Sequence, residues 1–69
     1  MKEERFIATV EDKYQVQEIA DDLKRLGFRI DNVLRLGGII IGSLNGKRLD
    51  QVKIKGVKMV EREMNNRGI

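Results

Sequence analysis

The amino-acid sequence predicts an α+β domain in which a four-stranded antiparallel sheet carries two helices on one face. Three observations lead to this prediction. One segment has apolar residues at helical spacing, four short segments are rich in β-branched and other apolar residues, and most of the boundaries between them carry glycines. A chain of 69 residues suits one small domain, so we predict a single domain over residues 1–69.

The first half of the chain contains the most clearly patterned elements. A strand is predicted at residues 6–10, where the apolar run FIATV is flanked by charged residues. Asp12 is the expected N-cap of the helix that follows, because its carboxylate can accept a hydrogen bond from a first-turn amide. Gly27 is expected to end this helix. Between them, one apolar stripe repeats at helical spacing: Val16, Ile19, Ala20, Leu23 and Leu26.

The second half alternates apolar runs with glycine-containing turns. The Gly37-Gly38 pair predicts a hairpin turn, and the strand before it is expected to be interrupted at Asp31-Asn32. The run of three isoleucines after the turn indicates a central strand. The predicted ranges are a strand at 28–36, a strand at 39–44, a short helix at 47–54 with Leu49 and Val52 inward, and a strand at 57–63.

The resulting order, strand-helix-strand-strand-helix-strand, is that of the ferredoxin-like fold, with both helices on one face of the sheet. Right-handed crossovers arrange the strands in the spatial order 4-1-3-2. Because side chains alternate along a strand, the residues predicted to face the helices are Phe6, Ala8, Val10, Ile39 and Ile41. The residues predicted on the helix-free face, with its apolar centre and basic margins, are Ile7, Thr9, Arg35, Ile40, Gly42, Lys58, Val60 and Arg62.

The composition excludes most catalytic and metal-binding chemistry. The chain has no cysteine and no histidine, which rules out disulfides, thiolate or imidazole metal ligands and histidine-activated nucleophiles. Ser43 lacks the second glycine of a nucleophile elbow. The adjacent Asp21 and Asp22 diverge by about 100° around a helix, so they do not converge on a metal ion. We therefore expect no enzyme activity, no cofactor and no metal site.

Charges are interspersed along the chain, with fourteen Lys and Arg residues, eleven Asp and Glu residues and a formal net charge of +3. This pattern is typical of a solvated surface, with a weak nucleic-acid site at Arg35, Lys58 and Arg62 as an alternative. Aromatic residues make up only 4% of the chain, and the basic-glycine-phenylalanine run of RNA-recognition modules is missing, so nucleic acid is not the favoured partner. No signal peptide or membrane-spanning segment is evident, so a cytoplasmic location is the default expectation.

Two segments carry a resemblance to a known family. They are GIIIGSL at residues 38–44 and, after the predicted short helix, GVKMVERE at residues 56–63. Together they resemble the propeptides of subtilisin-like serine proteases and the free-standing inhibitors related to them. In that family a central strand leads through a short helix to a final strand with a valine-x-x-valine-glutamate motif. The chain is at least as similar to small stand-alone bacterial proteins of this shape that have no established activity.

The resemblance implies a non-catalytic, protein-binding domain that acts as an inhibitor or folding assistant of a subtilisin-like protease. In that family the sheet packs on the protease surface and the C-terminal tail lies in the substrate cleft. Glu61 and Glu63 match the acidic positions of the last strand, where they could cap helix N-termini on a protease. The residues that correspond to the tail, which we expect to be flexible, are Met64, Asn65, Asn66, Arg67, Gly68 and Ile69.

A second hypothesis is self-association of the domain into a homo-oligomer through the helix-free face. This hypothesis rests on the exposed Ile7 and Ile40 that we predict there, and on the two edge strands of the sheet. Exposed apolar patches and unpaired strand edges usually acquire a partner or are shielded by other parts of the protein.

Overall fold

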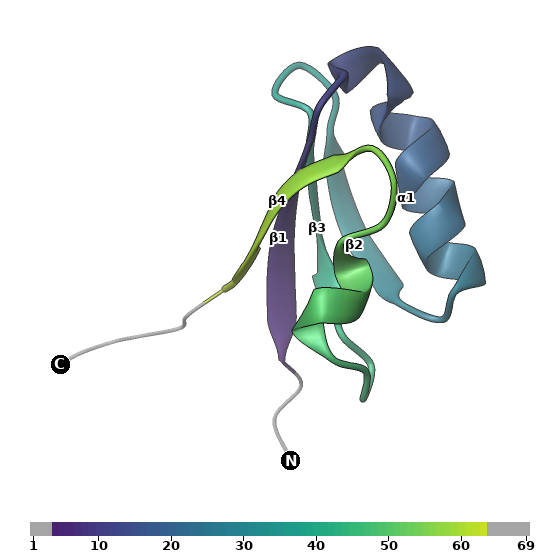
Figure 1. Ribbon diagram of the computed structural model, residues 1–69, viewed down its shortest axis with the longest axis vertical. Coiled ribbons are helices and arrows are strands. Elements are labelled where there is room, and N and C mark those ends of the chain that lie inside the picture. The colour runs from purple at the N-terminus through teal and green to yellow at the C-terminus, as the bar shows by residue number, and fades with distance from the viewer. Residues whose placement is uncertain (1–3, 64–69) are drawn as a thin grey trace, which may run out of the picture.

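The protein, seen in a computed structural model that describes residues 4–63, folds as a four-stranded antiparallel sheet with one α-helix in the described range (Figure 1). The predicted α+β class and antiparallel sheet are confirmed. The elements in chain order are β1 (Arg5–Val10), a 3₁₀ turn η1 (Lys13–Gln15), α1 (Val16–Arg25), β2 (Arg29–Leu34), β3 (Ile39–Ser43), a second 3₁₀ turn η2 (Leu49–Val52) and β4 (Val57–Arg62).

The strands lie in the order β2-β3-β1-β4 across the sheet, which counted from the other edge is β4-β1-β3-β2. All three neighbouring pairs are antiparallel. β3 is a central strand, as its three isoleucines predict, and β2 and β4 are the edges. Figure 1 shows α1 on one side of this sheet, and Val52 of η2 belongs to the same buried cluster as the α1 side chains.

The register between β1 and β3 pairs a large residue with a small one at each buried position. Phe6 lies opposite Gly42, and Ala8 lies opposite Ile40. Directly opposite residues share a face of the sheet, so Ile40 points toward α1 and is fully buried. The predicted outward positions of Ile40 and Gly42 are therefore wrong, and Ile39 and Ile41 lie on the helix-free face instead.

α1 covers the sheet with most of the predicted apolar stripe. The backbone N–H of Tyr14 donates to Asp12 Oδ1 at 3.0 Å, so Asp12 caps the helical segment as predicted, although the turn η1 precedes the α-helix itself. Gly27 follows the helix with a φ of +104°, a left-handed conformation that favours glycine. Leu26 is an exception to the predicted stripe, because it stands at the C-cap and is 51% exposed.

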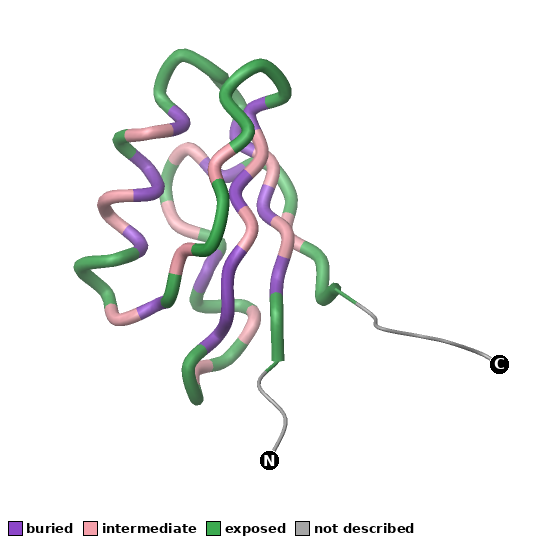
Figure 2. The backbone as a smooth tube through the Cα atoms, turned by 180° about the vertical axis from the view of Figure 1, so that it is seen from behind, coloured by how far each residue is buried: buried purple, intermediate pink, exposed green. Residues whose placement is uncertain are grey.

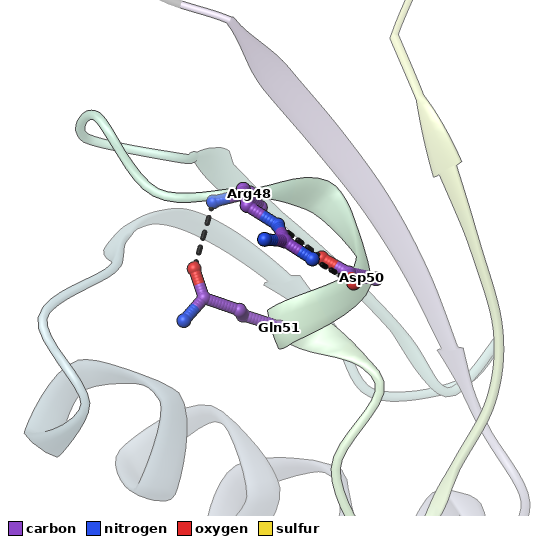
Figure 3. Close-up of polar contacts among 3 residues, drawn as sticks. All are labelled: Arg48, Asp50 and Gln51. Atoms are coloured by element: carbon purple, nitrogen blue, oxygen red, sulfur yellow. Dashed lines mark hydrogen bonds and ion pairs between the residues drawn. The ribbon is translucent and has the colours of Figure 1, made fainter.

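The predicted second helix at residues 47–54 is wrong, because only the single 3₁₀ turn η2 forms there. Its two inward apolar residues, Leu49 and Val52, are three positions apart, which matches the three residues per turn of a 3₁₀ helix. So short a segment also cannot offset the cost of nucleating an α-helix. Polar contacts hold the turn in place (Figure 3): the N–H of Arg48 donates to Gln51 Oε1 at 2.9 Å, and Arg48 Nη2 lies 2.9 Å from Asp50 Oδ2.

The hydrophobic core lies between the sheet and α1. The rings of Phe6 and Phe28 meet edge to face with their centroids 5.8 Å apart, a favourable arrangement for aromatic pairs. Figure 2 shows how buried and partly buried positions alternate along the central strands. The largest fully buried side chains of the core are Phe6, Leu23, Ile40, Leu44 and Val52.

Gly42 is predicted to be essential for this packing. A Cβ at this position would overlap the carbonyl oxygen of Arg29 in β2 and lie 3.1 Å from Phe6 Cζ. The Gly42→Ala substitution should therefore lower the free energy of unfolding by about 2–4 kcal/mol, as measured by urea denaturation. Gly37→Ala is the matched control, because the nearest atom there is Ile39 Cδ1 at 3.4 Å, and its effect should stay within about 0.5 kcal/mol. Equal effects of the two substitutions would contradict this packing.

The hydrogen bond and ion pair from Arg48 lower the pKa of the Asp50 carboxyl below its usual value. A carboxyl with a lowered pKa stabilises the fold above its unfolded-state pKa, and this contribution is lost as the pH falls through the folded-state pKa. We expect Arg48→Gln to raise the pKa of Asp50 in an NMR titration, and to reduce stability at neutral pH but not in acid. Arg35→Gln, which removes a charge in the β2–β3 turn, should leave the pKa of Asp50 unchanged.

Candidate functional site

The face of the sheet opposite α1 is the candidate functional site. We call it the open face. β1 places Arg5, Ile7 and Thr9 on it, since these residues alternate with the buried Phe6, Ala8 and Val10. The strand register then assigns the other members: Arg29, Asn32 and Leu34 of β2, Ile39, Ile41 and Ser43 of β3, Met59 and Glu61 of β4, and Glu63 beyond its end.

One half of the open face is apolar. Leu34 and Met59 are 41% and 47% exposed, and each lies at an opposite margin of the sheet. Between them, the partly exposed side chains of the two central strands continue the apolar surface. We call this region the apolar half; it consists of Ile7, Thr9, Leu34, Ile39, Ile41 and Met59.

The other half of the open face is charged, and Arg5 is its centre. Arg5 Nη1 lies 3.0 Å from Asp31 Oδ2, and Arg5 Nε donates to Glu63 Oε1 at 2.8 Å. Because β3 lies between β1 and β2, the Arg5 side chain crosses β3 to reach Asp31. Ser43, directly opposite Arg5 on β3, is only 2% exposed. We call this region the charged half; it consists of the open-face residues Arg5, Arg29, Glu61 and Glu63, together with Asp31, which Arg5 contacts.

Both edge strands contain a β-bulge. In β2 the register shifts between Ile30 and Asn32, which leaves Asp31 as the extra residue, at the interruption that the sequence predicts. In β4 the register shifts opposite Thr9 and Val10, and Lys58 is the extra residue. Bulges and charged residues make a strand edge a poor template for adding another strand. The open face, and not the sheet edges, is therefore the surface suited to a partner.

The predicted binding residues fall into two groups. Ile7 and Thr9 lie on the open face as predicted, and Glu61 and Glu63 stand at its β4 margin. Besides Ile40, the predicted position of Val60 is wrong: it lies opposite Ala8 and packs against the core. The prediction for Ile40 is wrong because three consecutive isoleucines show no alternation that would tell the two faces of β3 apart. The prediction for Val60 is wrong because the bulge at Lys58 shifts the alternation of side chains in β4.

The three basic residues predicted as a nucleic-acid site do not form a common patch. Arg35 lies in the β2–β3 turn, where its Nη2 donates to Gln17 Oε1 at 3.3 Å. Lys58 lies in the bulge of β4, at the other edge of the sheet. Arg62 lies opposite the inward-facing Phe6, and its Nη2 is 3.6 Å from Glu4 Oε1. Arg35 and Arg62 are thus not on the open face, contrary to the prediction.

Several members of the open face were not predicted from the sequence, namely Arg5, Leu34, Ile39, Ile41 and Met59. For Ile39 and Ile41 a usable signal was the size pattern of Phe6-x-Ala8 against Ile40-x-Gly42, which pairs large with small residues in only one parity. The predicted tail, residues 64–69, lies outside the described residues.

Other kinds of site find little support in the described structure. Across residues 4–63, no group of three or more His, Cys, Asp or Glu side chains could hold a metal ion. In the same range, no helix is long and apolar enough to cross a membrane. A shallow groove of about 390 Å³ lies away from the open face, between the start of the helix and the β2–β3 turn; its lining includes the exposed Tyr14 and Leu36.

Comparisons with known proteins do not assign the chain to a family: no family model, curated protein or solved structure matches it. The resemblance to subtilisin propeptides stays a prediction from residues 38–44 and 56–63. Function must therefore be inferred from the chemistry of the open face.

Arg5 is predicted to stabilise the sheet by linking β2 to the end of β4. Replacing it with alanine removes its contacts with both Asp31 and Glu63. Because the Arg5 side chain is 43% exposed, we expect Arg5→Ala to lower the free energy of unfolding by only about 1 kcal/mol, and less at high salt. Arg62→Ala, which removes one longer ion pair at 3.6 Å, should cost less than about 0.5 kcal/mol. Urea unfolding at low and high salt measures both; a larger loss for Arg62→Ala would contradict the role of Arg5.

Proposed function

We propose that the protein is a non-catalytic protein-binding domain whose docking surface is the open face. The observation that carries this proposal is the apolar half, which α1 leaves uncovered and which extends to both margins of the sheet. Apolar surface gathered on one flat face and bordered by charged residues is typical of protein interaction sites.

The chemistry of the open face favours a protein over a nucleic acid. Proteins that bind single strands on an open sheet stack the bases on exposed aromatic rings. Here the strand aromatic Phe6 is buried in the core, and Phe28 with it. The charged half holds two arginines and three carboxylates, a balance that does not attract phosphates.

A subtilisin-like protease is the partner that the sequence resemblance implies. Two features of the open face are compatible with it. Glu61 lies directly beside the apolar half, opposite Ile7, and Glu63 follows at the same margin. These carboxylates are placed so that they could meet helix N-termini of a protease while the apolar half packs against its surface.

The test is inhibition of a panel of purified subtilisin-like proteases by the protein at micromolar concentration. We expect slowed peptide hydrolysis by at least one protease, and we expect Met59→Glu to weaken inhibition by about tenfold or more, because it places a charge in the apolar half. Leu36→Glu is the matched control: Leu36 is 90% exposed in the β2–β3 turn, away from the open face, so inhibition should be unchanged.

Two results would contradict the proposal in different ways. No slowing of any protease in the panel would remove the protease as partner. Equal inhibition by the wild-type protein and by folded Met59→Glu would show that the open face is not the docking surface. Circular dichroism of each variant establishes that it is folded.

A further inference from the structure

The open face has an internal complementarity that points to a specific partner. Its residues form three rows that run across the sheet from β2 to β4. In each row the two residues at the margins of the sheet suit one another: two apolar side chains, an amide and a carboxylate, or an arginine and a carboxylate. In the order β2, β3, β1, β4, the rows are Leu34, Ile39, Thr9 and Met59; Asn32, Ile41, Ile7 and Glu61; and Arg29, Ser43, Arg5 and Glu63.

We propose that the open face binds a second copy of this chain, face to face, about a two-fold axis that runs parallel to the strands between β1 and β3. This inference rests on the proposed function, because it names the occupant of the same docking surface. The two-fold operation lays β2 over β4 of the partner subunit and β3 over β1 of the partner subunit. Two sheets packed in this way are close to the aligned arrangement common in sandwiches of two sheets.

This arrangement matches each row with a chemically suitable row of the partner. In the charged half, Arg29 meets Glu63 of the partner subunit. In the middle row, Ile41 meets Ile7 of the partner subunit, and at the apolar end Leu34 meets Met59 of the partner subunit. Apolar residues are thereby buried against apolar ones, and the opposite charges of the two margins face each other. Asp31 and Glu63 both stay in contact with Arg5 of their own chain, and Glu61 lies over Asn32 of the partner subunit.

The alternative two-fold axis, perpendicular to the strands, gives a poor match. It would lay each strand over the same strand or its neighbour in reversed direction, so that the charged half covers the apolar half of the partner. Arg29 would then meet Leu34 of the partner subunit, and Glu63 would meet Met59 of the partner subunit. Burying charges against apolar side chains is costly, so the charge pattern selects the axis parallel to the strands.

The small size of the open face predicts a weak dimer. Strands about 4.8 Å apart with about 3.4 Å per residue give a face of roughly 19 Å by 17 Å. The flat footprint of two such faces is only about 650 Å² in total, below the roughly 1,000 Å² that specific interfaces bury, so the dimer is weak. We expect a dissociation constant between about 10 and 500 μM.

Sedimentation equilibrium of the full chain, from about 10 μM to about 1 mM, tests this proposal in the expected range of affinity. The wild-type protein should dimerise, and Met59→Glu should weaken dimerisation by about tenfold or more, while Leu36→Glu should have no effect. Arg29→Glu and Glu63→Arg should each weaken dimerisation by about tenfold, because each places like charges opposite one another.

A mixture of these two charge variants is the decisive sample. In a heterodimer of Arg29→Glu with Glu63→Arg, both cross-interface pairs again have opposite charges, so association should return to within about threefold of the wild type. A monomeric wild-type protein at about 1 mM would overturn the proposal, as would a dimer that folded Met59→Glu leaves intact. Failure of the mixed variants to associate would overturn the proposed two-fold axis parallel to the strands, because that axis pairs Arg29 with Glu63 of the partner subunit.

The outcomes also separate this inference from the proposed function. A monomeric wild-type protein whose protease inhibition is lost in Met59→Glu would overturn the dimer and leave the proposed function standing. A dimer restored by the mixed variants, together with no inhibition of any protease, would support the dimer and remove the protease as partner.

Discussion

The packing of the β1–β3 pair beneath α1 is the constraint on which the rest of the structure depends. Phe6 over Gly42 and Ala8 beside Ile40 fill the space under the helix only in one register, because each pair combines a large with a small residue. A shift by one residue would expose these side chains and bury their neighbours. This register therefore decides which face of every strand is buried. With α1 the one α-helix in residues 4–63, it leaves the opposite face of the sheet uncovered.

Because no second layer covers the open face within residues 4–63, contacts inside the sheet hold its strands in place there. Arg5 helps to hold the strands, because its guanidinium contacts carboxylates at both edges of the sheet: Asp31 of β2, which it reaches across β3, and Glu63 after β4. The bulges at Asp31 and Lys58 also contribute. The bulge in β2 brings the carboxylate of Asp31 within reach of Arg5, and both bulges make the edge strands irregular. The protein thus limits unspecific strand addition at its edges while an apolar surface stays available on its face.

The proposed protein partner and the proposed second copy would use the same residues of the open face, so they exclude each other. A weak dimer would cover the apolar half when no other partner is present and would release it by mass action when a tighter partner binds. The charged half orients either partner, because both of its arginines and Glu63 lie at one end of the face. Both roles need a rigid, exposed sheet and no catalytic group.

The sequence by itself determined the strands, the main helix with its Asp12 cap, and the turn at Gly37-Gly38, because these follow from local spacing and backbone preferences. Only the tertiary structure decided which faces are buried. Three consecutive isoleucines have no alternation, so the position of Ile40 depends on its partner Ala8 across the strand pair. Residues 47–54 likewise form one 3₁₀ turn in place of the predicted helix. The segment is too short to sustain an α-helix, and its two apolar residues are spaced three apart, which matches a 3₁₀ turn. Local patterns set the elements, and long-range pairing set the surface that a partner would meet.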